Sequence, residues 1–470
     1  MKGGTEIQKD RSIIADEKFR EDALTKNTWE LVLKMGLPLA FYEMLNSLYK
    51  ILDSLMASHI NASSVSTVAY LAQISILISA VGQGLSVGGG LKISEAYGAG
   101  DYTLVRRRVS SLFALSGLLA LFVLLLIPAA PLILAGAGTP KELIEMGVPY
   151  FQIELVGLAV VFMNNTYIAI ERARGNTKRI FRLNMIVTVL KLLLTAFFVY
   201  ALNGTITMIS VASIISQSVL LIIGIKNMIF NQSAFRFSVK NIRMNKEILI
   251  PILLISFPVI VERIAFSAGK VIVNAMCGVY GALTVGALGI SNTVTGIFAN
   301  AQSGIQSGGA ALISQNMGGK KTERVPDILK KIVLVNLMIG ITGTILCYLG
   351  ADTVSTIYAS SSDGLDETFR QIIHGIFLYD SGGTIISWGI SASVEAFLYG
   401  IGKTKMILFI NVCRLFLFRI FFLWILQRYT SLGSECAGIV MMVSNNLTAV
   451  LSCILGAYEL RVFCRKNEIG

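Results

Sequence analysis

The sequence is poor in charged residues. Asp, Glu, Lys and Arg make up 14% of its 470 residues, whereas soluble domains carry about 25%. Because 54% of the chain is hydrophobic, so few charges cannot cover a water-exposed surface, and the composition indicates a protein whose solvent is a lipid bilayer. A net charge of +12 would suggest a nucleic-acid partner in a soluble chain. Here the basic residues lie between apolar runs, and no nucleic-acid partner is predicted.

Histidine is almost absent, and several enzyme motifs are missing altogether. His59 and His374 are the only histidines, so no metal site is predicted. The six cysteines form no CxxC pair and lie mostly in apolar runs, which favours a role as small apolar side chains. No GxxxxGK[ST], HExxH or GxSxG segment occurs. We therefore expect no catalytic residue, no enzyme activity and no cofactor.

Long apolar runs dominate what is present. Crossing about 30 Å of hydrocarbon takes about 20 helical residues, and lipid offers the backbone no hydrogen bonds, so such runs must be helices. The runs are 31–57, 66–96, 109–135, 147–170, 180–202, 205–230, 248–277, 284–316, 329–350, 369–400, 404–427 and 433–460. The sequence predicts an all-α membrane protein with twelve transmembrane helices.

Basic residues gather on one side of these helices. Most of the 40 Lys and Arg lie near the N-terminus, in loops after even-numbered helices, and at the C-terminus. Positive residues mark the cytoplasmic side, so both termini are predicted in the cytoplasm of a cell whose inner membrane holds the chain. The predicted parts are a cytoplasmic tail (1–29), a first lobe (30–230), a basic linker (231–246), a second lobe (247–464) and a cytoplasmic end (465–470).

The two halves of the sequence repeat each other. At an offset of 220 residues the matched positions are Pro38 and Pro258, Lys50 and Lys270, Gly84 and Gly304, Gly88 and Gly308, and Gly98 and Gly318. A later block, Gly175–Lys178, matches Gly402–Lys405 at an offset of 227. Each half has six helices, so the predicted pseudo-twofold axis runs along the membrane normal. Such repeats bind substrate between the halves and rock around it.

The repeated glycines and prolines each allow two interpretations. Small residues let membrane helices pack closely, and an unwound turn is the alternative for the glycines. Pro38 and Pro258 each lie about eight residues into a helix, where proline removes a backbone hydrogen bond and bends the helix. These prolines are the predicted hinges, and a static bend is the alternative.

A polar stripe marks the first helix of each half. Glu43, Asn46, Lys50 and Asp53 follow one another at steps of three and four, which places them on one helical face. Charge is too costly to face lipid, so we expect this face to line a wet interior. The seventh helix carries a matching set, consisting of Glu262, Arg263, Ser267, Lys270 and Asn274.

Further ionisable and amide side chains lie inside the predicted helices. Glu154 is a candidate for lining the first lobe, and Asp380 is the candidate acid of the second lobe; a structural ion pair is the alternative for Glu154. Asn164 and Asn165 are candidate solute contacts, with bonds between helices as the alternative. The substrate-cavity candidates are therefore Asn46, Lys50, Glu154, Asn164, Asn165, Glu262, Arg263, Lys270 and Asp380. Arg414 and Arg419 are interpreted as snorkelling or bridging helices.

Several motifs recur in a fixed order. Pro38 precedes Asp53 by fifteen residues, and Gly98–Asp101 and Arg174–Lys178 recur as Gly318–Lys320 and Gly400–Lys405. This pattern resembles the multidrug and toxic compound extrusion (MATE) family, in particular its bacterial DinF-like branch. The resemblance implies a V-shaped pair of six-helix lobes and export of mostly cationic or amphipathic compounds, coupled to Na⁺ or H⁺ entry. The wider superfamily also holds flippases for lipid-linked sugars.

The resemblance also implies a coupling site. Asp53 stands where the family has a first-helix carboxylate that binds the coupling cation, and a buried carboxylate can also take up a proton. On helix five, Lys191 and Thr195 replace the family's Asn and Asp, and an ammonium group repels Na⁺. We hypothesise that Lys191 pairs with Asp53 or Glu43 in one state; a permanent bridge is the alternative. The predicted site for H⁺ or Na⁺ is Asp53, Glu43, Lys191 and Thr195.

These features predict a secondary active transporter that exports small organic solutes or drugs by H⁺ (or Na⁺) antiport with alternating access. The expected partners of this monomer are a small-molecule substrate and the bilayer. Because Lys50, Lys191, Arg263 and Lys270 are all cationic, an anionic or zwitterionic substrate is an alternative to a cationic one. The alternative within the superfamily is a flippase for a lipid-linked saccharide or another anionic amphiphile. A membrane-embedded enzyme and a channel are alternatives from other classes.

Overall fold

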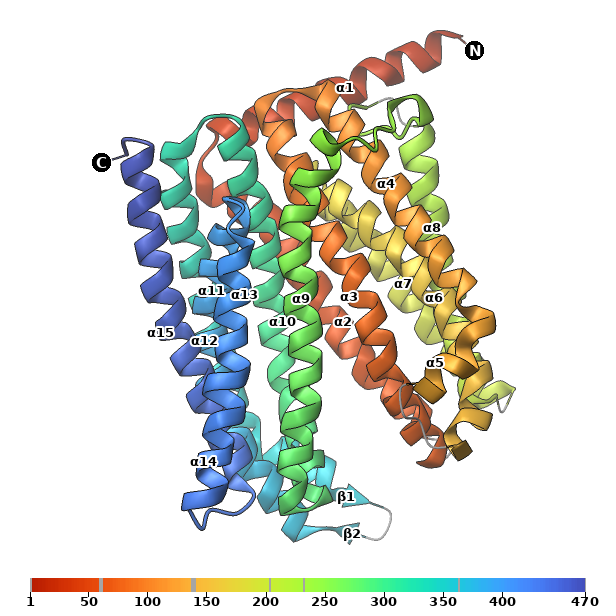
Figure 1. Cartoon of the computed structure of the whole chain (residues 1–470), viewed down its shortest axis with the longest axis vertical. Coiled ribbons are helices and arrows are strands. Elements are labelled where there is room, and N and C mark those ends of the chain that lie inside the picture. The colour runs from red at the N-terminus through yellow and green to blue at the C-terminus, as the bar shows by residue number, and fades with distance from the viewer. Residues whose placement is uncertain are drawn as a thin grey trace. The chain divides into compact units, whose positions relative to one another are not determined.

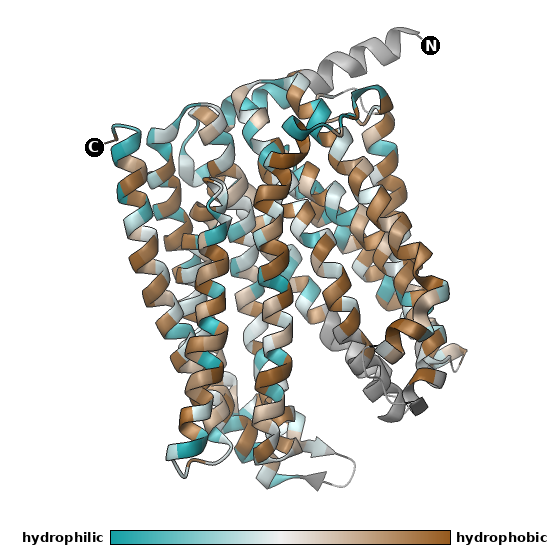
Figure 2. Ribbon diagram, in the orientation of Figure 1, coloured by the Kyte–Doolittle hydropathy of each residue, from teal (hydrophilic) through white to brown (hydrophobic). Residues whose placement is uncertain are grey.

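The computed structural model of the chain consists almost wholly of helices (Figure 1). The described residues are 2–58, 62–136, 141–202, 204–230, 233–361 and 364–469. Within them, the side chains left undescribed are those of residues 2–13, 49–58, 62–70, 72–73, 141–143, 145–146, 206, 361 and 364–365. Hydrophobic residues dominate the length of the long helices, and hydrophilic ones gather at helix ends and in connecting segments (Figure 2).

The chain packs into two compact units. The first unit is formed by Met1–Asn27, Leu48–Arg263 and Ser314–Lys320, and the second by Thr28–Ser47, Ile264–Ile313 and Lys321–Gly470. These units do not coincide with the two sequence halves, because the beginnings of α2 and α9 each join the unit built mainly from the other half. The lobe boundaries predicted at residues 30, 231, 247 and 465 stay predictions.

Most helices belong to a single unit. The first unit contains α1 (Lys2–Thr25), α3 (Ala62–Ala99), α4 (Tyr102–Leu125), α5 (Ala130–Gly136), α6 (Lys141–Ala173), α7 (Thr177–Ala196), α8 (Ile206–Phe230) and a π-helical segment (Phe197–Ala201). Helices shared by both units are α2 (Thr28–Ser58), α9 (Lys246–Cys277) and α10 (Ala282–Gly318). The second unit contains α11 (Val325–Ala359), β1 (Ser360–Ser361), β2 (Gly364–Leu365), α12 (Glu367–Gly400), α13 (Thr404–Val412), α14 (Phe421–Tyr429) and α15 (Glu435–Lys466). Short 3₁₀ turns occur at Ile127–Ala129, Val239–Asn241, Gly278–Tyr280 and Thr322–Arg324.

The helices fit the twelve predicted passes, with one pass broken. Among the described residues, ten helical spans are long and apolar enough to cross a membrane; α2 and α12 complete the set of twelve. The span predicted at 109–135 is wrong as one helix, because α4 ends at Leu125 and a 3₁₀ turn with Pro128 near its start precedes α5. Proline lacks the N–H that would continue the helix.

Glycines on α3 and α10 allow close helix packing. A Cβ on Gly88 would lie 2.2 Å from Ser256 Oγ of α9, within the first unit. A Cβ on Gly304 would lie 2.4 Å from the backbone nitrogen of Ala40 on α2, within the second unit. The second helix of each half therefore packs directly on the first helix of the other half. The packing interpretation of these glycines is what the structure shows.

The ends of α3 and α10 meet reciprocally inside the first unit. A Cβ on Gly98 would lie 1.9 Å from Gln315 O, and a Cβ on Gly318 would lie 1.9 Å from Glu95 O. The offset of 220 relates Gly98 to Gly318 and Glu95 to Gln315, so residue pairs exchange places across the contact. Such isologous contact is the signature of twofold symmetry and agrees with the predicted repeat.

The charged tail predicted at residues 1–29 is helical through α1 and docks on the first unit. Asp16, 3% exposed, forms an ion pair with Arg174 at 2.5 Å. Arg20 Nε donates to Gly98 O at 3.1 Å. These contacts join α1 to the end of α3 and to the connection that follows α6.

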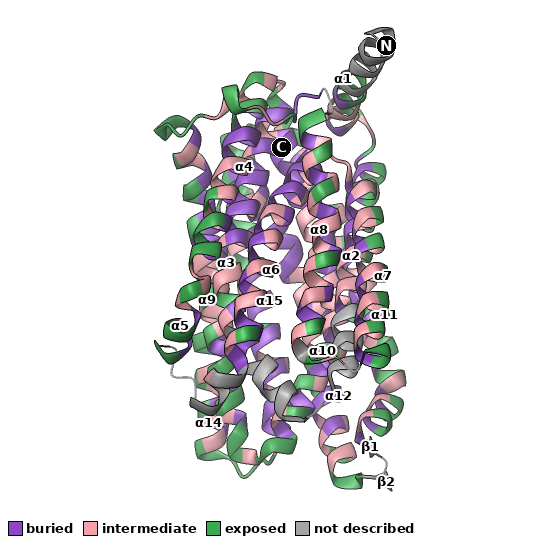
Figure 3. Cartoon of the chain, turned by 90° about the vertical axis from the view of Figure 1, so that its right-hand side faces the viewer, coloured by how far each residue is buried: buried purple, intermediate pink, exposed green. Residues whose placement is uncertain are grey.

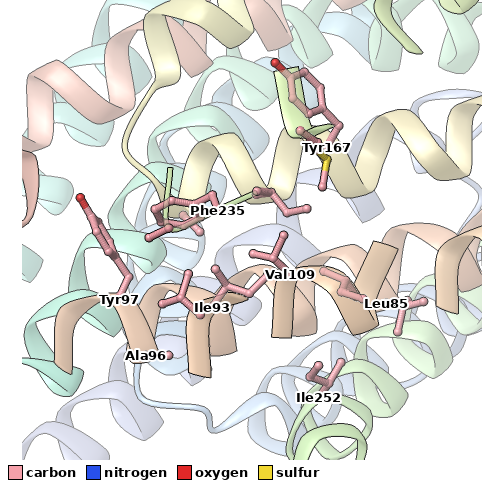
Figure 4. Packing of buried hydrophobic residues seen from close by; sticks show 14 of the residues in the cluster. Leu85, Ile93, Ala96, Tyr97, Val109, Tyr167, Phe235 and Ile252 are labelled. Carbon is pink, nitrogen blue, oxygen red and sulfur yellow. The ribbon is translucent and has the colours of Figure 1, made fainter. Parts of the chain in front are cut away.

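A buried apolar core holds the first unit together. Figure 4 shows Ile93, Val109 and Ile252 from three helices converging in it. Phe235, from the predicted linker, packs edge-on against Tyr97 with ring centroids 5.0 Å apart. The linker is therefore docked on α3 in addition to joining the two halves. Among the described residues, those that are buried lie mainly on helix faces that pack against other helices (Figure 3).

Candidate functional site

The eleventh membrane pass changes its helical geometry midway. α13 ends at Val412, residues Cys413–Ile420 are π-helical, and α14 begins at Phe421. Five residues span about 140° around an α-helix axis, whereas the i→i+5 bonds of a π-helix bring such residues onto one face. Arg414 and Arg419 share this segment, and each is only 5% exposed. The π-helical segment thus directs two arginines into the second unit.

Asp380 lies at the centre of a polar cluster in the same unit. It is fully buried on α12, which packs between α11 and α15. Ser291 Oγ from α10 donates to Asp380 Oδ2 at 2.6 Å, and Thr295 Oγ1 lies 3.4 Å from the same oxygen. Thr384 Oγ1, one turn along α12, donates to Asp380 Oδ1. These hydroxyl groups donate hydrogen bonds to the oxygens of Asp380, which would be energetically costly to bury without such partners.

Arg419 connects to this carboxylate through an amide. Its Nη2 donates to Asn445 Oδ1 at 3.1 Å, and Asn445 Nδ2 donates to Thr384 Oγ1 at 2.7 Å. The positive charge of Arg419 also acts directly on Asp380, and such an interaction is strong where water is scarce. The Asp380 cluster consists of Asp380, Ser291, Thr295, Thr384, Asn445 and Arg419.

The cluster allows Asp380 to hold or release a proton in place. When it is ionised, the carboxylate accepts hydrogen bonds from the surrounding hydroxyl groups, and its negative charge offsets the positive charge of Arg419. Protonated, it becomes a donor, and a hydroxyl can rotate to accept because each carries both a proton and lone pairs. Ionisable groups at membrane depth are expensive and are therefore functional candidates.

Arg414 is held by two aromatic rings. Its Cζ lies 4.6 Å from the ring centroid of Phe266 and 4.9 Å from that of Trp388. Lys270 Nζ lies 5.0 Å from the Phe266 centroid. Cation–π attraction stabilises both positive charges. The second unit therefore contains an aromatic and cationic region besides its acid.

Both halves of the chain match one family model, described as MatE, over residues 38–197 and 258–425. The chain belongs to the MatE family. Each match begins at one of the paired prolines, Pro38 and Pro258, and this confirms the internal repeat. Membership of the MATE family is thereby confirmed, while the DinF-like branch stays a prediction.

Relatives of this MatE chain carry names that refer to drug resistance and export. It is 19% identical over 366 residues to the probable multidrug resistance protein YoeA of Bacillus subtilis (strain 168), covering 75% of this chain and 78% of that protein. It is 22% identical over 344 residues to the multidrug export protein MepA of Staphylococcus haemolyticus (strain JCSC1435), covering 72% and 74%.

Solved structures share the fold of the MatE chain. A crystal structure of MATE in complex with MaL6 matches with a TM-score of 0.88 and 18% identity, covering 94% of this chain and 99% of that one. A second match is a MOP superfamily transporter from Pyrococcus furiosus Vc1 (DSM3638), described as having a reverse polarity of binding pocket that suggests a different function. Its TM-score is 0.88 and its sequence identity 18%, and the match covers 94% of this chain and 98% of that one. The predicted all-α fold, with twelve transmembrane helices in two six-helix lobes, is confirmed.

The coupling site predicted in the first lobe is only partly described. Lys191 and Thr195 lie one turn apart on α7, 8% and 0% exposed. Asp53 is helical on α2, but its side chain and that of Lys50 lie outside the described ones. The proposed pairing of Lys191 with Asp53 or Glu43 therefore stays a prediction.

Several residues of the predicted polar stripes on the first and seventh helices are half-buried. Glu43 and Asn46 are half-buried on α2, where Ser47 Oγ accepts from Asn300 Nδ2 at 2.6 Å within the second unit. Arg263 Nη1 on α9 donates to Gln83 Oε1 on α3 at 2.9 Å within the first unit.

The remaining candidates of the seventh and fourth helices differ in burial. Glu262, Glu154 and Asn165 are half-buried, and Lys270 is exposed. Asn164 is 2% exposed, and its Nδ2 donates to both O and Oε1 of Gln217 on α8 at 2.9 Å. These bonds favour the interhelical interpretation of Asn164.

The candidate hinges lie in unbroken helices. α2 continues through Pro38 and α9 through Pro258. Their role as hinges stays a prediction.

Sequence reasoning found Asp380 but missed the groups around it. Thr384 carried a local signal, because a hydroxyl four residues from an acid shares its helical face. Ser291, Thr295 and Asn445 come from α10 and α15 and have no local signal. The shared face of Arg414 and Arg419 depends on the π-helical turn, which periodicity in the sequence does not reveal.

Proposed function

We propose that this MatE-family chain exports small organic solutes or drugs in exchange for protons, with the Asp380 cluster as the site that takes up and releases the proton. The observation that carries this proposal is a fully buried carboxylate held by hydroxyl groups and opposed by Arg419. The names of YoeA and MepA support export of drugs. Asp380 was predicted as a cavity acid, and this proposal gives it the coupling role.

Proton binding would change the balance of charge in the second unit. With Asp380 ionised, its charge offsets that of Arg419; with Asp380 neutral, a buried guanidinium remains uncompensated. Uncompensated buried charge is strongly destabilising, so protonation favours a conformation in which Arg419 finds other partners or water. The π-helical segment that carries Arg419 suits such a change, because π-bulges recur at functional sites. Differential stability of two states is what couples a proton to movement.

The local charges favour H⁺ over Na⁺. A sodium ion at Asp380 would need several oxygen ligands free of competing donors. Asn445 Oδ1, the nearby amide oxygen, already accepts from Arg419, whose charge repels a second cation. A proton binds one carboxylate oxygen and needs no such shell.

A second candidate function is movement of an anionic amphiphile, including a lipid-linked saccharide. The observation that favours it is the number of buried cations, since Lys191, Arg414 and Arg419 are all at most 8% exposed. The Pyrococcus furiosus transporter of reverse pocket polarity has the same fold. An anionic headgroup would find complementary charge in such an interior.

The proposed setting is the cell inner membrane, with both termini in the cytoplasm and the chain acting as a monomer without a cofactor. Basic residues at the ends of α1 and in the linker support this orientation. Cysteine labelling of Ile14→Cys, an exposed position on α1, in intact cells would test it. Modification by a membrane-impermeant reagent would contradict a cytoplasmic N-terminus.

Reconstituted protein tests the function directly. Proteoliposomes receive an H⁺ or a Na⁺ gradient separately, and fluxes of ethidium and carboxyfluorescein are followed. We expect saturable ethidium transport driven by the H⁺ gradient and abolished by Asp380→Asn. Carboxyfluorescein transport instead would favour the second candidate, dependence on Na⁺ alone would overturn proton coupling, and ohmic current would overturn the carrier.

A further inference from the structure

A line of polar side chains runs along α12 from Asp380 toward Gly400. Asp380, Thr384, Ser387, Ser391 and Glu395 follow at steps of four, three, four and four. At 3.6 residues per turn they lie within about 80° around the helix axis, and at 1.5 Å rise per residue the line is about 22 Å long. Thr384 is half-buried, and the other four are at most 5% exposed. We refer to these five residues as the polar stripe.

Glu395 forms the far end of the polar stripe. It is 3% exposed, and its Oε2 accepts from Gln306 Nε2 of α10 at 2.7 Å. Its Oε1 accepts from Asn411 Nδ2 of α13 at 3.0 Å. The residue lies just over one turn before α12 ends, on the side that carries the basic loops. A second buried acid thus stands between Asp380 and the proposed cytoplasmic side.

The middle of the stripe offers hydroxyl groups at each turn. Ser387 Oγ donates to Asn446 Oδ1 of α15. Ser391 Oγ is buried and has no hydrogen-bond partner within the described part of the chain. A buried hydroxyl without a partner is unusual unless water reaches it. The stripe is therefore suited to hold water between its side chains.

The sequence repeat shows that the fold does not require this polarity. At the offset of 227, the equivalent positions on α6 are Ile153, Gly157, Val160, Asn164 and Ile168. Four of these five are apolar, and the one amide is bonded to Gln217 on α8. Helices α6 and α12 belong to matching parts of one family model. A purely structural need would apply to both helices, so the stripe on α12 points to chemistry.

We propose that the polar stripe carries the proton from Asp380 to the cytoplasmic side, with Glu395 as a second proton-carrying group. This inference rests on the proposed function of Asp380. Thr384 Oγ1 donates directly to Asp380 Oδ1. Farther along the stripe, Cβ atoms one turn apart are about 5–6 Å from each other, which exceeds hydrogen-bond distance, so the proposal places bridging water in those gaps. Each hydroxyl or water accepts a proton on a lone pair as it releases its own, and Glu395 takes the proton and gives it to cytoplasmic water.

Charges around the stripe set the direction of transfer. The charge of Arg419 from the π-helical segment acts on Asp380, whereas Glu395 accepts hydrogen bonds from the neutral amides of Gln306 and Asn411. The positive charge of Arg419 repels a proton held on Asp380 and so favours its release along the stripe.

Proton movement and solute exchange separate this role from a structural one. Full-length protein is reconstituted with a pH dye inside, and ethidium-driven proton movement is compared with ethidium–ethidium exchange, which needs no net proton flow. Glu395→Gln should slow proton movement at least tenfold and change exchange less than twofold. The matched control is Glu459→Gln, since Glu459 is a buried acid outside the stripe, 7% exposed on α15 and paired with Lys403 at 3.6 Å. Unchanged proton movement, or equal loss of both activities, would overturn the inference.

The middle of the stripe provides a second test. Ser391→Ala should slow proton movement severalfold, and Ser391→Thr, which keeps the hydroxyl, should restore it; equal rates for both variants would argue against the route. If Asp380→Asn stops proton movement while Glu395→Gln does not, the inference alone fails. If ethidium and carboxyfluorescein move no protons through the unmodified protein, the proposed function fails with it.

Discussion

The two units handle charge inside the membrane in opposite ways. The second unit joins Asp380 to Arg419 through Asn445 and Thr384. In the first unit, Lys191 and Thr195 are buried on α7 at positions where the resembled family has an amide and an acid. Both sequence halves match the same family model, so the difference is chemical and not architectural. It teaches that a repeated fold can carry different buried charges in its two copies.

The largest expected effect separates the acids of the two units. Asp380→Asn should lower H⁺-driven transport at least 100-fold, because the amide cannot take up a proton. Glu154→Gln, the corresponding change of a half-buried acid on α6, should lower it less than threefold. Initial rates of ethidium flux in proteoliposomes measure both variants. Equal losses would remove the proposed asymmetry.

A smaller effect is expected at the predicted first-lobe site. If Lys191 pairs with Asp53 in one state, Asp53→Asn should lower H⁺-driven transport about tenfold, and adding Lys191→Met should recover part of the loss because no buried cation is left alone. The same flux assay checks this double-mutant cycle. Undiminished transport by Asp53→Asn would exclude a proton role for that carboxyl.

Filling a packing glycine with a larger side chain should lower thermal stability by similar amounts in the two units. Gly88→Val and Gly304→Val each force a side chain against a facing helix, at Ser256 and Ala40. Overpacking typically costs about 1–3 kcal/mol, so both variants should lower the thermal midpoint in detergent by similar amounts. Differential scanning fluorimetry gives the midpoints, with Gly278→Ala, where a Cβ meets nothing within 4 Å, as the control. A loss in one variant alone would show that the two contacts are not equivalent.

The smallest effect concerns α1, the docked helix of the first unit. Burial raises the pKa of Asp16, although Arg174 partly opposes this. Because the docked state then binds a proton more readily than the undocked state, docking is strongest at low pH and weakens as pH rises from the ordinary carboxyl range through the raised pKa. Hydrogen exchange of residues 14–25 should show severalfold lower protection across that window. Asp16→Asn should remove the pH dependence, and protection that increases with pH would contradict the raised pKa.

Part of the site could be predicted because local patterns report it. The apolar runs gave the membrane passes, and their bounds differ from the helices mainly where Pro128 ends α4. Asp380 stood out as an acid at membrane depth. Helix α1 was missed because a charged segment gives no membrane signal, although Asp16 and Ala23 are buried. Its docking depends on Arg174 and Gly98, which lie far along the chain.

The sequence by itself determined three things: the bilayer as solvent, the repeat of two six-helix halves, and the family. It could do so because hydropathy, loop charge and repeated glycines are local properties of the sequence. Only the tertiary structure decided which polar groups meet. Hydrogen bonds act over about 3 Å. The groups on other helices that bond Asp380 and Glu395 come from α10 and α13, and Asn445 of α15 reaches Asp380 only through Thr384. The π-helical turn decided, in the same way, that Arg414 and Arg419 both face inward.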